Sequence, residues 1–213
     1  MSRAKPAGKR RGPKVDPERL AARVMREPDR LEEIIRGLEA AQGAARFGWA
    51  KVLLILARKA PAILYPRLDV VLGLLRGESK ILQWTAILAI GDLAAVDSKG
   101  RIEAILDELL APIPGPVMIT AANTIGAAAK IARARPRLAD RIAREILKVE
   151  KARYATPECR NVAIGQAIEA LDEFFEAISD REPVIGFIER QLENTRPATR
   201  KKAEKWLGRH RRD

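Results

Sequence analysis

The amino-acid sequence predicts an all-α protein, organised as an α-solenoid in which pairs of helices stack one after another. Composition is the first observation, because aromatic residues make up only 4% of the 213 residues while alanine, leucine and isoleucine are abundant. The second is spacing, since apolar residues recur at every third or fourth position from Asp16 onward. The third is an internal repeat of about 35 residues, a period typical of stacked helix pairs.

The repeat is clearest in two segments that align at an offset of 35 residues. Residues 82–93 (LQWTAILAIGDL) align with residues 117–128 (VMITAANTIGAA), with identical Thr, Ala, Ile and Gly positions. A Pro-Arg-Leu tripeptide at residues 66–68 recurs at residues 136–138, two periods later. Alanine occupies equivalent positions at 86, 121 and 203, where a small side chain would let neighbouring helices approach closely.

Over residues 16–209 the chain resembles the HEAT-repeat family of armadillo-like α-solenoids. The resemblance rests on the length of the helix pair, on the Ala-x-x-x-Ile-Gly pattern at 86–91 and 121–126, and on the arginine near the start of the second helix. It implies a right-handed solenoid whose second helices line the concave surface, where partners generally bind. The aspartate that the family pairs with each arginine is clear at Asp97, and Asp180 is a further candidate.

Helix starts follow from capping residues and prolines. Asp16 before Pro17, and Thr156 before Pro157, each supply an N-cap followed by proline in the first helical turn. One or two helices within residues 17–42 would cap the N-terminal end. The sequence predicts about five units, with helices over 44–60 and 66–76, 79–95 and 99–111, 116–134 and 136–151, 157–178 and 183–193, and a closing helix over 197–209.

The net charge of +12 is concentrated at the two ends of the chain. Residues 1–14 hold six basic residues and no acid, and residues 196–213 hold eight basic residues and two acids. The 181 residues between them carry 26 basic and 26 acidic side chains. We therefore expect a disordered basic arm over 1–15, a solenoid over 16–209 and a basic tail over 210–213. A neutral scaffold with basic ends favours a polyanionic partner.

Few side chains are suited to catalysis or to metal binding. The chain has one histidine, His210, and one cysteine, Cys159, and the two are far apart in the sequence. A cysteine nucleophile would lack a base, and neither a disulfide nor a Cys-rich zinc site can form. We predict a protein that is not an enzyme and has no cofactor and no small-molecule substrate.

One enzymatic alternative accompanies the resemblance, because some HEAT-like proteins are DNA glycosylases that excise alkylated bases with a Trp and an Asp. Trp84 and Asp92 are the corresponding candidates, although the few aromatic residues argue against a base-binding pocket. The longest apolar run, residues 52–57, is too short to span a membrane, and no secretory leader is visible. A cytoplasmic location without membrane contact is therefore expected.

The most informative internal feature is a stripe of five basic residues in the predicted helix 136–151, namely Arg137, Arg141, Arg144, Lys148 and Lys151. Their spacing of four, three, four and three residues places them on one helical face, which suits a phosphate backbone. The alternative is an ordinary charged surface, partly offset by Asp140 and Glu145. An acidic cluster is formed by Glu169, Asp172, Glu173 and Glu176. It is either a site for a cation or a basic partner, or an ordinary face exposed to solvent.

The sequence thus predicts a binding module that contacts nucleic acid or another acidic surface through its basic ends and the basic stripe. The rival prediction is a protein-binding adaptor that holds a peptide or helix in its concave surface. The candidate nucleic-acid-binding residues are Lys9, Arg10, Arg11, Lys14, Arg137, Arg141, Arg144, Lys148, Lys151, Arg200, Lys201, Lys205 and Arg209.

Overall fold

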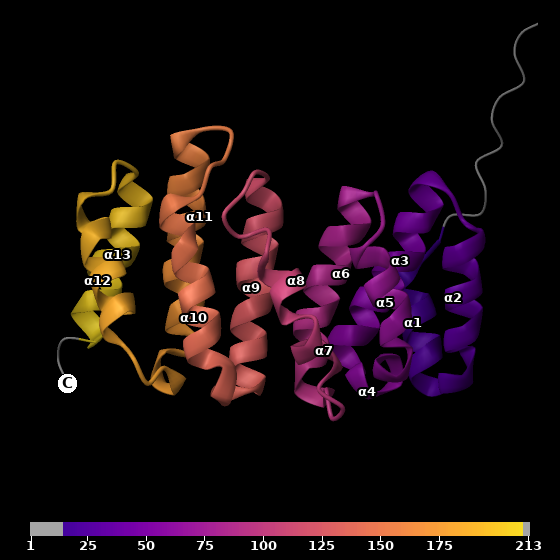
Figure 1. Ribbon diagram of the computed structural model, residues 1–213. Coiled ribbons are helices and arrows are strands. Elements are labelled where there is room, and N and C mark those ends of the chain that lie inside the picture. Colours follow the sequence, from indigo (N-terminus) through magenta and orange to yellow (C-terminus); the bar gives the residue numbers. More distant parts are fainter. Residues whose placement is uncertain (1–14, 211–213) are drawn as a thin grey trace, which may run out of the picture.

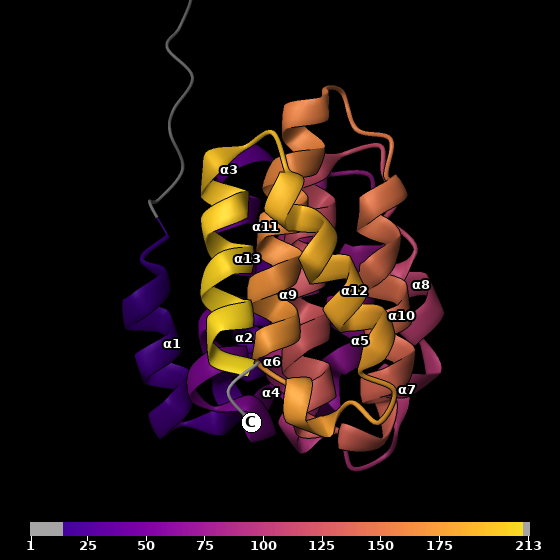
Figure 2. The same cartoon turned by 90° about the vertical axis from the view of Figure 1, so that its left-hand side faces the viewer.

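The computed structural model describes residues 15–210, in which every regular element is a helix (Figure 1). The helices form two layers, which the view along the array shows side by side for the C-terminal part, while helices of the N-terminal part lie farther back and overlap them (Figure 2). Each helix of the first layer packs on the next one along the chain. These helices are α1 (Pro17–Arg26), α3 (Gly43–Lys59), α6 (Lys80–Leu93), α9 (Met118–Ala134), α11 (Pro157–Asp172) and α13 (Pro197–His210).

The helices of the second layer run antiparallel to the first-layer helices that they follow in the chain. Most of them are shorter than the first-layer helices. The α-helices of this second layer are α2 (Leu31–Ala40), α4 (Pro61–Leu64), α5 (Leu68–Leu75), α7 (Arg101–Ala104), α8 (Leu106–Leu110), α10 (Ala139–Leu147) and α12 (Glu182–Arg190). Within the described residues this arrangement makes five helix pairs followed by α13. The predicted all-α solenoid is therefore confirmed, and residues 17–42 form a full pair of their own.

Several predicted boundaries are wrong. The second helix of the 44–76 unit begins at Pro61 and not at 66, because Pro61 itself suits the first turn of a helix. The predicted helix 99–111 is interrupted at Ile105. The predicted helix 157–178 ends at Asp172, and the turn that follows buries both Phe174 and Phe175 in the core.

Small residues bring the first-layer helices together, as the repeat pattern predicts. Ala86, Ala121 and Ala203 are all fully buried. A Cβ atom on Gly91 in α6 would lie only 2.8 Å from the Cα atom of Ala127 in α9, so this glycine permits the close approach of the two helices. Gly126, which the repeat aligns with Gly91, is exposed and has no atom within 4 Å of such a Cβ.

This difference predicts opposite effects for the same substitution. Gly91→Ala is expected to destabilise the fold by about 2 kcal/mol, because α6 and α9 must separate to admit the methyl group. Gly126→Ala is expected to stabilise it by about 0.5–1 kcal/mol, since alanine has the higher helix propensity and meets no neighbour. Urea unfolding followed by circular dichroism measures both, and equal changes in the two variants would contradict the packing described.

Asp97 links consecutive repeats at the turn between α6 and α7. Its buried carboxylate accepts hydrogen bonds from the Tyr65 hydroxyl (2.6 Å) and from the backbone N–H groups of Arg101 (2.9 Å) and Ile102 (3.0 Å). The pKa of Tyr65 is raised mainly by burial of the hydroxyl and, to a smaller extent, by its hydrogen bond to this carboxylate. Asp180 is exposed, and at its turn the carboxylate of Asp140 accepts from the N–H groups of Ser179 and Asp180. The carboxylate of Asp97 therefore joins two repeats, but within residues 15–210 it does not pair with an arginine side chain as the resemblance implies. Near Asp180 the comparable backbone contacts are made by Asp140.

None of the described helices is both long enough and apolar enough to cross a membrane.

Candidate nucleic-acid interface

The N-terminal candidates Lys9, Arg10, Arg11 and Lys14 lie outside the described residues. The description begins at Val15, whose side chain lies against α3. A Cβ atom on Gly48 would come within 2.8 Å of the Val15 Cβ atom, so these two residues are in close contact. Val15, which follows the basic segment 1–14 in the sequence, is therefore packed against α3.

Two arginines of the predicted basic stripe on α10 and the turn before it are neutralised by the preceding repeat. Both terminal nitrogens of Arg137 donate to the carboxylate of Glu103 in α7, one of them over 2.6 Å. Arg141 forms an ion pair of 2.6 Å with Asp107 in α8. The hydrogen bond from Arg137 lowers the pKa of Glu103 and raises that of Arg137, so both groups stay charged and paired.

The other three members of the stripe differ from one another. Lys148 pairs with Glu145 on its own helix over 2.6 Å. Arg144 and Lys151 are exposed, and within residues 15–210 no carboxylate lies at ion-pair distance from either. Arg144 also lies near Asp140, whose pKa it helps to lower, although backbone hydrogen bonds from Asp180 and Ser179 contribute more. The segment that carries the five residues is a short α-helix between two 3-10 turns and not the continuous helix that was predicted.

The same pairing between neighbouring repeats recurs along the second layer. Arg76 donates two hydrogen bonds to Glu108, over 2.9 and 2.8 Å, and Arg190 donates two to Glu150 over the same distances. Arg67, which the tripeptide repeat aligns with Arg137, pairs with Glu32. Arg67, Arg137 and Arg190 thus bridge to an acid one repeat earlier, whereas Arg76 bridges to an acid one repeat later.

The C-terminal candidates on α13 also fall into residues with a hydrogen-bond or ion-pair partner and residues without one. Arg200 donates to the backbone carbonyl of Asn194 over 2.8 Å, and Arg209 pairs with Asp172 of α11 over 2.9 Å. Lys201 and Lys205 are exposed on the side of α13 that faces away from the core, and neither has an acidic partner among the described residues. Arg200 also lacks an acidic partner among the described residues, because its acceptor is a neutral carbonyl. These three side chains of α13 therefore keep their positive charge.

Sequence reasoning missed an arginine stripe on α1. Arg19, Arg23 and Arg26 are exposed and follow one another at intervals of four and three residues, so they share one helical face. The buried residues Ala21 and Val24 lie on the opposite face. No ion pair engages these arginines within the described part of the chain. Their spacing alone could have revealed them, since it matches that of the α10 stripe.

The acidic cluster of α11 and the turn after it is occupied by cations of the protein itself. Glu169 pairs with Lys202, Asp172 with Arg209 and His210, Glu173 with Arg133, and Glu176 with Arg181. Each pair joins neighbouring segments of the fold. Among the described residues, no group of three or more acidic, histidine or cysteine side chains is arranged to hold a metal ion.

The two side chains of the glycosylase alternative are engaged in contacts between helices. The indole N–H of Trp84 in α6 donates to the Thr120 hydroxyl of α9 over 2.9 Å. Asp92 pairs with Arg58 of α3 over 3.1 Å and also with Lys130 of α9. Both residues therefore connect neighbouring helices of the first layer.

Comparison with known protein families finds no matching family, and no curated protein matches the sequence. Solved structures do resemble the fold. A designed armadillo repeat protein, YIII(Dq)4CqI, superposes with a TM-score of 0.57 at 16% identity, over 91% of this chain and 90% of that one. An engineered protein from the Northeast Structural Genomics Consortium superposes with a TM-score of 0.58 at 15% identity, over 91% and 87% of the two chains. The fold is thus that of an armadillo- or HEAT-like helical repeat.

Proposed function

We propose that this protein is a non-enzymatic binding module that holds nucleic acid at its N-terminal end. The observation that carries the proposal is the stripe of Arg19, Arg23 and Arg26 on α1, which lies directly after the basic segment 1–14. Together these residues supply nine cations, six from the segment and three from α1, within 26 residues. A phosphate backbone binds such a surface by releasing its condensed counterions.

The distribution of ion pairs supports this location over the α10 stripe. Arginines that already share a carboxylate, such as Arg137 and Arg141, would have to give up that partner before they could bind a phosphate. The α1 arginines form no ion pair within residues 15–210, and Glu27, the acid that interacts with Arg23 and Arg26, is already paired with Arg30. Lys201 and Lys205 on α13 add two further cations at the opposite end of the array (Figure 1). We therefore assign the main contact to the N-terminal end and a weaker, separate one to α13.

The test is the binding of a fluorescent duplex to the full chain and to a variant in which Lys9, Arg10, Arg11 and Lys14 are all replaced by glutamine. At about 50 mM salt the variant is expected to bind on the order of 100-fold more weakly, because four phosphate contacts are lost. The Lys201→Gln/Lys205→Gln variant serves for comparison, and we expect its loss to be smaller. If the full chain does not bind the duplex even at low salt, the adaptor interpretation, in which a protein occupies the solenoid, replaces this proposal.

A further inference from the structure

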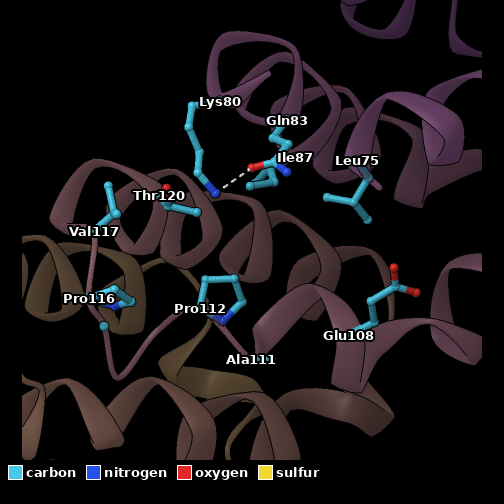
Figure 3. A pocket seen from close by; sticks show the side chains of 11 residues that line it. Leu75, Lys80, Gln83, Ile87, Glu108, Ala111, Pro112, Pro116, Val117 and Thr120 are labelled. Atoms are coloured by element: carbon cyan, nitrogen blue, oxygen red, sulfur yellow. Dashed lines mark hydrogen bonds between the residues drawn. The ribbon is translucent and has the colours of Figure 1, made fainter. Parts of the chain in front are cut away.

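A second site, unrelated to the basic surfaces, lies where α6, α8 and the loop before α9 meet. A cavity of about 380 Å³ opens there, a size within the range of small-ligand sites. Apolar side chains form most of its wall, among them Leu75, Ile87, Pro112 and Val117 (Figure 3). Lys80 and Thr120 contribute polar atoms from the first turns of α6 and α9.

The wall of this cavity is fixed by the following repeat. The backbone N–H of Arg153 donates to the carbonyl of Pro114 over 3.0 Å, and the Tyr154 hydroxyl donates to the carbonyl of Ile113. Gly115 has a φ of +125°, and a Cβ atom there would lie 2.6 Å from the carbonyl oxygen of Arg153. These contacts with Arg153 and Tyr154 hold the lining loop in place, so the site is preformed.

The cavity coincides with the most apolar part of the described surface. The exposed large hydrophobic residues among residues 15–210 are Ile81, Val117 and Ile119. All three lie at the N-terminal ends of α6 and α9, where Val117 itself lines the cavity and Ile81 and Ile119 are next to the lining residues Lys80 and Thr120. Apolar side chains grouped around a preformed hollow are typical of a ligand site.

The polar atoms of the cavity carry an uncompensated positive charge. Glu108 shares both carboxylate oxygens with Arg76, and this hydrogen-bonded contact lowers its pKa, so its charge is already balanced. The ammonium group of Lys80 donates only to the neutral side-chain oxygen of Gln83, over 3.0 Å. Thr120 is buried, with 9% of the residue exposed, and its hydroxyl accepts from the indole N–H of Trp84, which leaves the hydroxyl proton to donate.

From this arrangement we infer that the cavity binds a ligand with a carboxylate attached to an apolar body. The carboxylate pairs with Lys80 and accepts from the Thr120 hydroxyl, and the apolar body lies against Leu75, Ile87, Pro112 and Val117. Two sources offer this chemistry, a free organic acid and the C-terminal residue of a peptide chain. The inference is independent of the proposed nucleic-acid contact, because it uses none of the residues of α1 or α13.

The test compares 4-phenylbutanoate with its neutral amide, using calorimetry and the NMR signal of the Trp84 indole N–H, which is bonded to Thr120. The acid is expected to bind at least about tenfold more tightly than the amide and to shift that signal. Lys80→Met should abolish the preference for the acid, and Thr120→Val should reduce it. Ala111→Phe, which fills the cavity from an exposed position, should prevent binding of both compounds.

The control variant is Lys51→Met, which removes an exposed lysine of α3 outside the cavity and should leave binding unchanged. The tripeptide acetyl-Ala-Ala-Leu, with a free or an amidated C-terminus, distinguishes the two sources of the carboxylate. If its free acid binds more tightly than 4-phenylbutanoate, the ligand is a chain terminus. If 4-phenylbutanoate binds more tightly, the ligand is a free organic acid. Equal binding of acid and amide, binding that survives Ala111→Phe, or no binding of any probe at millimolar concentration would overturn the inference.

Discussion

Replacing Asp97 with alanine is expected to destabilise the solenoid by about 3 kcal/mol or more, among the largest effects of any single substitution in this chain. Asp97 is 4% exposed, and its carboxylate accepts three hydrogen bonds, one of them from Tyr65 of the preceding repeat. Its removal leaves the Tyr65 hydroxyl and two backbone N–H groups without this acceptor. Urea unfolding followed by circular dichroism measures the loss.

The matched control is Asp180→Ala, since Asp180 is exposed and its side chain makes no hydrogen bond within the described residues. We expect a change within about 0.5 kcal/mol for this variant. Tyr65→Phe removes one of the three hydrogen bonds and should cost about 1 kcal/mol. A loss below about 1 kcal/mol for Asp97→Ala would show that Asp97 does not hold the two repeats together.

Replacing Arg19, Arg23 and Arg26 together with glutamine is expected to weaken duplex binding on the order of 10- to 100-fold at about 50 mM salt. The three arginines lie on the solvent side of α1 and have no acidic partner in the described part of the chain, so their loss changes the free charge of the surface directly. Fluorescence anisotropy with a short labelled duplex measures the change, and circular dichroism checks that the fold is kept.

The control for this variant removes the same number of charges from paired positions. Arg67, Arg137 and Arg190 are each bonded to a carboxylate of a neighbouring repeat. Replacing these three with glutamine should alter duplex affinity by less than about threefold, because the net charge falls equally but no free cation is lost. If both triple variants weaken binding equally, overall charge and not the α1 stripe governs the affinity.

Much of the fold was predictable because each repeat carries its own local pattern. The spacing of apolar residues and the prolines at helix starts are features of single helices. They were therefore sufficient to predict the alternation of the two layers and the positions of most helices. Asp97 was also identified from its place in the repeat. The interruption at Ile105 and the early end of α11 at Asp172 were missed, since both depend on packing between helices.

The candidate site was harder to predict than the fold, because the charge of a side chain depends on its neighbour in the next repeat. Arg137 and Arg141 share a face with Arg144, as their spacing indicates. However, the acids that neutralise them, Glu103 and Asp107, lie 34 residues earlier in the chain. Only the stacking of α10 against α7 and α8 determines these pairs. The cavity beside α6 was unpredictable for the same reason, since three separate segments form its wall.

The salt dependence of duplex binding tests the central claim most directly. The slope of the logarithm of the binding constant against the logarithm of salt concentration reports how many phosphates the protein neutralises. The account predicts a steep slope for the full chain, smaller by roughly 2.7 in the Arg19/Arg23/Arg26→Gln variant and unchanged in the Arg67/Arg137/Arg190→Gln control. Equal slopes in the full chain and the α1 variant would contradict the claim that the N-terminal end of the solenoid holds the nucleic acid.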